Sequence, residues 1–269
     1  MKAAVLLSLV TAAAAGGCKN WNYPTTTIAG IEVVDTQIVR DALSLIKNSG
    51  LKDYVVKHQI RSWLFGAQQL NNNATLKSIV DPQAQAITIL LHDLGWDQSA
   101  DSPWTTKDLR FEVDSANGMR NFVRNHPDGK QISERKLQQM WDAIALQGAY
   151  GLASQKEPLV WGSINGIAND YEDPVSSAST RPSTTRSSRS SLLSHRPCIL
   201  STQILFLTLS VTISNSTDLL TGTNETFKWF CETKPETTYD TWVEGWGTYF
   251  VEGYDATGHR QVDQFRTVF

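Results

Sequence analysis

Cysteine is scarce in this sequence of 269 residues, which contains only Cys18, Cys198 and Cys231. No two of them form a C-x-x-C pair, the spacing that marks zinc ribbons and thiol redox motifs. An odd and widely spaced set allows one disulfide at most. The scarcity therefore argues against a disulfide framework and against a cysteine-based zinc site.

An excess of basic residues is also missing. The chain has 24 Lys and Arg against 27 Asp and Glu, for a net charge of −3 at pH 7. Nucleic acids and anionic membrane surfaces bind proteins that concentrate positive charge. Aromatic residues are plentiful, with 9 Trp, 9 Phe and 7 Tyr, which excludes collagen-like and wholly disordered classes. We expect a globular protein with a small-molecule partner and no nucleic-acid partner.

The first residues have the pattern of a secretory signal. One positive charge, Lys2, precedes a short apolar run over 3–10 and small residues over 11–17. The run is too short to span a bilayer, which favours a cleaved leader. We predict a signal peptide over 1–17 and a secreted protein. In a secreted chain, the N-x-[ST] triplets at Asn73, Asn215 and Asn224 are glycosylation candidates.

Apolar residues recur at helical spacing from about residue 32 to 170. The periodic segments predict helices over 35–50, 53–70, 81–94, 111–124, 133–147 and 159–170. No stretch shows sustained alternation with a period of 2, which a half-buried strand requires. We therefore expect an all-α fold, a helical bundle over 32–174.

The composition changes over 175–218. This segment is first rich in Ser, Thr and Arg and then, over 198–214, uncharged and apolar. The first part cannot bury a core, and the Ser and Thr of the second make it a poor membrane span. We interpret 175–218 as an irregular insert, with a translated intron as the hypothesis for its origin, and expect no membrane span. The C-terminal remainder covers 219–269.

Two histidines and two aspartates form a pattern that suggests a metal site. His92-Asp93 comes at the end of an apolar predicted helix, where unpaired polar groups are costly to bury. His58 lies on the preceding predicted helix, and Asp170 ends a later one. Imidazole and carboxylate together are ligands for zinc, iron or manganese.

The spacing H…HD…D on successive helices resembles the HD-domain metal-dependent hydrolase superfamily. Several motifs resemble, more narrowly, the fungal and bacterial HD proteins related to cyanamide hydratase: H-x-x-RSWLFG, LLHDLGWD, RFEVDSANGMRNFVRNHPDG and WDAIAL. The resemblance runs from about residue 40 to 174 and resumes over 231–263. It implies an HD-domain helical bundle that the 175–218 segment interrupts.

The resemblance also implies the roles of individual residues. The metal ligands would be His58, His92, Asp93 and Asp170, holding one divalent ion, with zinc as the first choice. Asp93 would also orient or deprotonate the attacking water, with Glu112 as a second candidate acid or base. The expected substrate pocket contains Arg61, Trp96, Asp114 and Gln147. For Arg61 the alternative is a salt bridge within the bundle, and for Glu112 and Asp114 it is a solvated helix start, where acidic residues are favoured.

Gln147 departs from the family pattern, because relatives usually have a histidine there. A glutamine side chain is not a comparable ligand and has no useful pKa. We therefore expect a single metal ion. The predicted chemistry is addition of water to a cyanamide-like or nitrile-like molecule. Phosphohydrolysis and a catalytically impaired metal-binding protein are the two alternatives.

Overall fold

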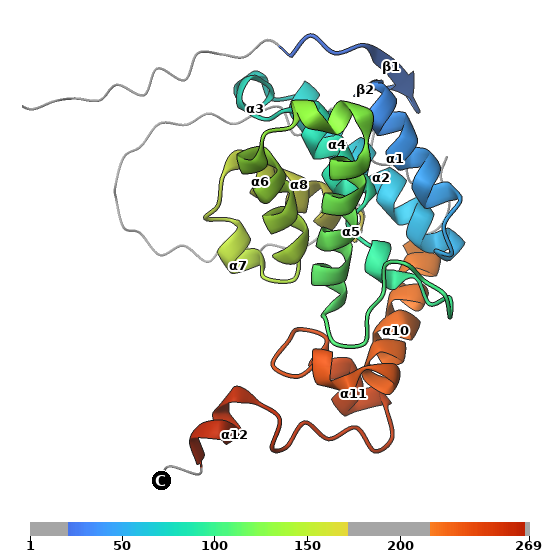
Figure 1. Ribbon diagram of the computed structural model, residues 1–269, viewed down its shortest axis with the longest axis vertical. Helices are drawn as coiled ribbons and strands as arrows, with labels where there is room; N and C mark the ends of the chain where they lie inside the picture. Colours follow the sequence, from blue (N-terminus) through green and yellow to red (C-terminus); the bar gives the residue numbers. More distant parts are fainter. Residues whose placement is uncertain (1–20, 172–215, 267–269) are drawn as a thin grey trace, which may run out of the picture.

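The computed structural model describes residues 21–171 and 216–266, and within them the all-α prediction is confirmed (Figure 1). The helices are α1 (Gln37–Lys47), α2 (Asp53–Asn71), α3 (Ala74–Ile79), α4 (Pro82–Leu90), η1 (Leu94–Trp96), α5 (Phe111–Asn125), η2 (Pro127–Gln131), α6 (Glu134–Ala145), α7 (Tyr150–Ala153), α8 (Pro158–Ala168), α10 (Ser216–Thr233), η4 (Pro235–Thr237), α11 (Glu244–Phe250) and α12 (Gln261–Arg266). The helices up to α8 form one bundle, and those from α10 onward form a C-terminal region.

Helix α4 is the centre of the bundle and packs against α1, α2, α6 and α8. Asp81 caps it by accepting hydrogen bonds from the backbone N–H groups of Gln83 and Ala84, and Pro82 fills the first turn, where no N–H donor is needed. From Gln83 onward every residue of the helix is buried. The prediction of a buried central helix beginning at 81–82 is correct.

The end of α4 differs from the prediction. The helix ends at Leu90, not at Leu94, and His92 and Asp93 lie in a turn that leads into η1. Both residues are almost fully buried. Successive residues of a helix point to different faces, so they cannot aim at one point. In a turn this restriction is lifted, and the side chains of adjacent residues can converge.

A short β-hairpin precedes the bundle and was not expected. Strand β1 (Thr25–Ile28) pairs antiparallel with β2 (Ile31–Val34). The turn residues Ala29 and Gly30 have φ values of 49° and 81°, and positive φ at both central residues is what a two-residue hairpin turn of type I′ requires. Strands of four residues are too short to show a period of 2 in the sequence. The predicted domain start at residue 32 therefore falls inside β2.

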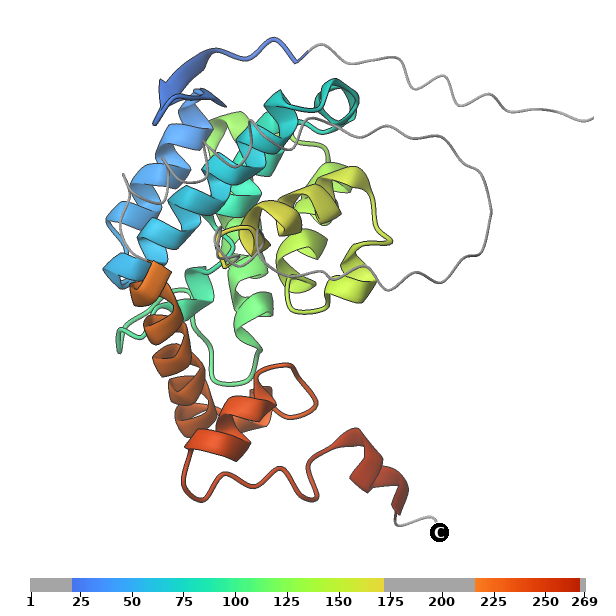
Figure 2. The ribbon, with the colours of Figure 1, turned by 180° about the vertical axis from the view of Figure 1, so that it is seen from behind.

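Helix α10 joins the C-terminal region to the bundle (Figure 2). The Tyr54 hydroxyl of α2 donates to the carbonyl of Gly222 and also contacts the Thr226 hydroxyl. A side chain at Gly222 would place its Cβ 2.5 Å from ring atoms of Tyr54, so the glycine permits the close approach. Because α10 begins at Ser216, the last three residues of the predicted insert are helical.

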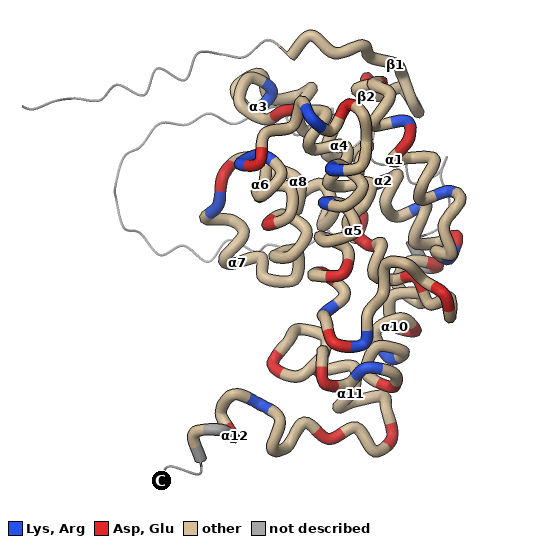
Figure 3. The backbone as a smooth tube through the Cα atoms, viewed as in Figure 1, with Lys and Arg blue, Asp and Glu red and all other residues tan. Residues whose placement is uncertain are grey.

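Several predictions fall outside the described residues. The proposed signal peptide over 1–17, the apolar run over 198–214, residues 175–215 of the insert and Asn215 all lie there. In the described part of the chain, no helix combines the length and the apolar character that crossing a membrane requires. Figure 3 shows Lys and Arg interspersed with Asp and Glu over the bundle.

Candidate metal centre

Three buried side chains meet where α2 passes the turn after α4. The Nε2 atoms of His58 and His92 lie 3.1 Å apart, and Oδ2 of Asp93 lies 3.1 Å from His92 Nε2 and 3.8 Å from His58 Nε2. Each side chain is at most 2% exposed. The sequence prediction that His58 and the His92-Asp93 pair come together is correct.

Hydrogen bonds at the far side of each ring determine which nitrogen faces the centre. Nδ1 of His92 lies 2.6 Å from the Ile89 carbonyl, and Nδ1 of His58 lies 2.7 Å from Oδ2 of Asp170. Both partners are acceptors, so each Nδ1 carries the hydrogen of a neutral ring. Two Nε2 lone pairs and a carboxylate then face one another, an arrangement that repels itself unless a cation or a proton lies between them.

The chemistry of these donors fits a metal ion. Oδ1 of Asp93 is buried and has no hydrogen-bond partner among the described residues. Ligand atoms about 2.0–2.2 Å from one tetrahedral ion lie about 3.4 Å apart, and the distances at this centre fall on either side of that value. His58, His92 and Asp93 could therefore hold one metal ion.

Asp170, predicted as the fourth ligand, lies behind His58. Arg61 donates to it through Nε, at 2.6 Å from Oδ1, and through a terminal nitrogen, at 2.8 Å from Oδ2. Burial would raise the pKa of the Asp170 carboxyl, but the hydrogen bonds from His58 and Arg61, together with the positive charge of Arg61, outweigh it and lower the pKa. A carboxylate behind a ligating imidazole orients the ring and strengthens its basicity. Direct ligation by Asp170 stays a prediction.

A cavity of about 490 Å³ opens beside His58 and Asp93. Its described lining comes from the bundle on one side and from the C-terminal region on the other. The lining residues are His58, Asp93, Trp96, Phe111, Gln147, Tyr150, Ile164, Ile167, Ala168, Tyr171, Leu220, Thr223, Asn224, Phe227, Trp242 and Trp246.

Two of the predicted pocket residues line this cavity. Trp96 is 2% exposed and packs edge to face against Phe227, with ring centroids 5.2 Å apart. Gln147 donates from Nε2 to the carbonyl of His92, at 3.1 Å. The amide of Gln147 therefore supports the turn that carries the two central residues.

Arg61 and Asp114 do not line the cavity, which differs from the prediction. Arg61 is committed to Asp170. Asp114 accepts hydrogen bonds from the backbone and hydroxyl of Thr106 and from Nζ of Lys234. Each is held in a buried ion pair, and breaking such a pair would leave a charge without a partner.

Glu112, the second candidate acid or base, is 1% exposed and also lies outside the lining. It pairs with Arg110 at 2.6 Å, and its Oε1 accepts a hydrogen bond from the indole nitrogen of Trp242 at 2.8 Å. The structure thus places Glu112 behind the cavity wall, where it holds a lining aromatic in position.

The aromatic wall was not found from the sequence. Phe227 packs edge to face against Trp242 and Trp246, with ring centroids 4.8 and 4.9 Å apart. Tyr171 packs against the ring of His58 at 4.9 Å. The available signal was two tryptophans only four residues apart, although Trp242 lies in the turn before α11 and only Trp246 lies in the helix. That signal could not indicate that both rings meet the metal centre.

The glycosylation candidates have different surroundings. Asn73 is exposed and caps α3, accepting a hydrogen bond from the Leu76 N–H. Asn224 lies within α10, lines the cavity and accepts from the Trp246 indole. Asn224 is exposed, so a glycan on it would start at the edge of the cavity, whereas Asn73 lies outside the lining. Modification of either residue stays a prediction.

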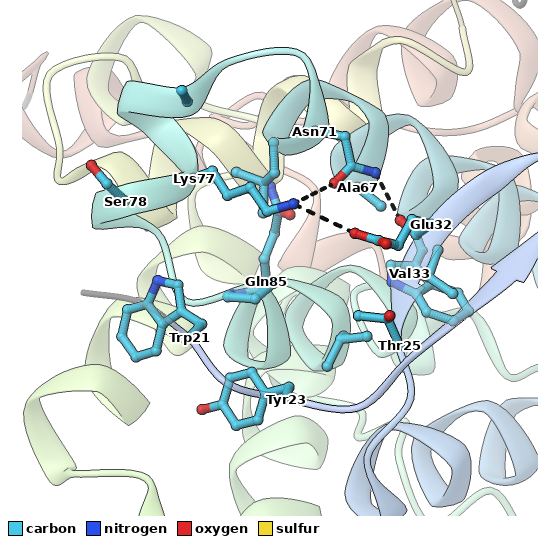
Figure 4. A pocket seen from close by; sticks show the side chains of 15 residues that line it. Trp21, Tyr23, Thr25, Glu32, Val33, Ala67, Asn71, Lys77, Ser78 and Gln85 are labelled. Carbon is cyan, nitrogen blue, oxygen red and sulfur yellow. Dashed lines mark hydrogen bonds and ion pairs between the residues drawn. The ribbon is translucent and has the colours of Figure 1, made fainter. Parts of the chain in front are cut away.

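A second cavity, of about 310 Å³, lies under the hairpin (Figure 4). Lys77 reaches across it to Glu32 at 3.5 Å and to the amide oxygen of Asn71 at 3.2 Å. Trp21 and Tyr23 stack along one side. His58, His92 and Asp93, the described side chains grouped so that they could hold a metal ion, do not line this second cavity.

Comparison of the chain with protein-family models, with curated proteins and with solved structures found no match.

Proposed function

We propose that this protein is a metal-dependent hydrolase or hydratase of the HD-domain superfamily that adds water to a small nitrile-like molecule. The observation that carries the proposal is the buried group of His58, His92 and Asp93 at the end of a cavity of about 490 Å³. A site that only stabilised the fold would be closed by a full set of protein ligands, whereas this one borders a space that a substrate could enter.

The donor set supports one divalent ion, with zinc first and iron or manganese as alternatives. Two neutral imidazoles and one carboxylate suit each of these metals. When bound, such an ion lowers the pKa of a coordinated water, so that the water becomes a nucleophile near neutral pH.

The chain's own residues support the reaction in three ways. Oδ1 of Asp93 has no hydrogen-bond partner among the described residues and is available to accept a proton from the attacking water. Asp170 fixes the ring of His58, so that its Nε2 faces the centre. Gln147 steadies the turn of His92 through the backbone carbonyl.

The cavity lining favours hydration over phosphohydrolysis. No Lys or Arg is among its described residues. The two nearby guanidinium groups, on Arg61 and Arg110, are bound to Asp170 and Glu112. A nucleotide would bring several negative charges, and a site for it would need positive side chains to offset them. A nitrile brings none.

Metal content of the purified full-length chain tests the metal centre. The protein would be stripped with a chelator, reloaded with zinc, iron(II) or manganese, and analysed by mass spectrometry. We expect about one ion per chain in the wild type and none in His92→Ala. His259→Ala is the matched control, because His259 is half-exposed and its side chain contacts Glu236 and Tyr239, away from the metal centre. A wild type that retains no ion after reloading would refute the proposal.

A substrate screen then separates the chemistries. Loaded protein would be given cyanamide and a set of nitriles, with nucleoside phosphates in parallel. We expect amide or urea products from the former and no phosphate release from the latter. Phosphate release would favour the phosphohydrolase. Metal binding without any turnover would favour the impaired protein that Gln147 suggests.

A further inference from the structure

The cavity beside the metal centre has two chemically different ends. His58 and Asp93 form one end, which comes from the bundle. The other end is a wall of aromatic and aliphatic side chains, among them Phe227, Trp242 and Trp246 of the C-terminal region. A ligand that fills the space therefore touches the polar side chains of His58 and Asp93 at one end and mostly aromatic rings elsewhere.

The polar atoms of Trp242, Trp246 and Tyr171 are already paired within the protein, whereas the buried indole nitrogen of Trp96 has no hydrogen-bond partner among the described residues. The indole nitrogen of Trp242 donates to Glu112, and that of Trp246 donates to Asn224. The hydroxyl of Tyr171 contacts the hydroxyl of Thr223 at 3.2 Å. These side chains therefore offer the cavity ring surface rather than charge.

The size of the cavity adds a second constraint. A cavity of about 150 Å³ lined by apolar side chains holds one benzene ring. The space here, about 490 Å³, is about three times as large. Cyanamide, with three heavy atoms, would leave most of it empty, and a ligand gains affinity by covering apolar surface.

We propose that the substrate is an uncharged, largely aromatic molecule that contains one aromatic ring or two fused rings. Its small electrophilic group would lie at His58 and Asp93, and its rings against the wall formed by α10 and α11. This inference rests on the proposed function and narrows it from nitriles in general to aryl nitriles. The absence of Lys and Arg from the described lining disfavours an anion, and a metal ion at the centre disfavours a cation.

Binding of matched probes to the full-length, metal-loaded chain tests the substrate class. The probes are 2-naphthonitrile, the anion 2-naphthalenesulfonate, the 2-naphthyltrimethylammonium cation and cyanamide, measured by calorimetry or tryptophan quenching. We expect 2-naphthonitrile to bind at least about tenfold more tightly than each of the other three. Equal or tighter binding of either charged probe, or of cyanamide, would overturn the inference.

A pair of variants on α11 places the rings. Trp246→Ala removes part of the wall and should weaken binding of 2-naphthonitrile about tenfold. Tyr249→Ala is the matched control, because Tyr249 is 81% exposed and lies outside the lining. It should leave the affinity unchanged. An unchanged affinity in a folded Trp246→Ala protein would contradict the placement. If that variant does not fold, the charge series on the wild type still decides.

The two proposals fail in different ways. Selective binding of 2-naphthonitrile by a chain that takes up no metal would refute the metal-dependent function and keep the ligand class. Metal uptake with turnover of cyanamide and no preference for 2-naphthonitrile would keep the function and refute the ligand class.

Discussion

Asp170 and His58 come from helices distant in the sequence, and a hydrogen bond of 2.7 Å joins the carboxylate to Nδ1 of the ring. The same carboxylate binds the guanidinium of Arg61 through two donors. The buried Asp170 carboxylate therefore orients His58, a candidate ligand. Among the described residues it is also the only partner of the buried Arg61 side chain.

Asp170→Asn should weaken metal binding while leaving some affinity. The amide can still accept from His58, but it loses the charge that strengthens the imidazole as a ligand. Loss of such a supporting carboxylate typically costs about 10–100-fold in metal affinity. Competition with a chelator of known affinity measures the change. Asp53→Asn, on an exposed residue, is the control. Complete loss of binding by a folded Asp170→Asn protein would instead indicate direct ligation.

The metal ion should stabilise the folded chain, because its ligands come together only in the fold. At a free metal concentration of about 100 times the dissociation constant, the free energy of unfolding rises by about 2.7 kcal/mol. Thermal unfolding with and without the ion measures this rise. Asp93→Asn should abolish it, and His259→Ala should not. A rise that persists in Asp93→Asn would place the ion elsewhere.

Gly222→Ala should destabilise the contact between α10 and α2. The new Cβ would lie 2.5 Å from the ring of Tyr54, whose hydroxyl is held by two partners on α10. Overpacking of this kind costs about 1–3 kcal/mol. Gly245→Ala on α11 is the matched control, since nothing lies within 4 Å of its Cβ position. Urea unfolding measures both, and equal stability of the two variants would contradict the close approach.

Acid should weaken the ion pair between Glu244 and Arg260. The hydrogen bond from Arg260 lowers the pKa of the Glu244 carboxyl, against a smaller opposing effect of burial. The pair therefore adds stability above the unfolded pKa of about 4.3, and this is lost as the pH falls through the lower folded pKa. Because Arg260 is about one-third exposed, solvent screens the pair and the gain in stability is small.

Unfolding measured from pH 6 to pH 3 tests this ion pair. Glu244→Gln should lose stability at pH 6 and differ less from the wild type at pH 3. Glu252→Gln, at an exposed position of the same region, should run parallel to the wild type. A Glu244→Gln protein with the same deficit at both pH values would contradict the prediction.

Local signals in the sequence predict the bundle well. Asp81 followed by Pro82 marks the start of α4, and the apolar residues after it mark burial. The hairpin is missed because its strands are only four residues long, with the turn determined by Ala29 and Gly30. Periodicity needs a longer window than these strands provide.

The candidate site is predicted only in part. The meeting of His58 with His92-Asp93 follows from the motif, but the partner of Asp170 does not. Arg61 lies one turn from His58 on α2, and only the packing of α8 against α2 brings the carboxylate to both. The aromatic wall likewise depends on the position of α10, which no local pattern fixes.

The two halves of the cavity enter the chain at different times during synthesis. His58, His92, Asp93 and Asp170 precede residue 171, whereas the wall of Phe227, Trp242 and Trp246 follows residue 216. A nascent chain that stops before Ser216 would carry every candidate ligand but none of the C-terminal aromatic residues that line the cavity. Under the proposed function, the residues that would hold the metal ion are therefore translated before those that would select a substrate.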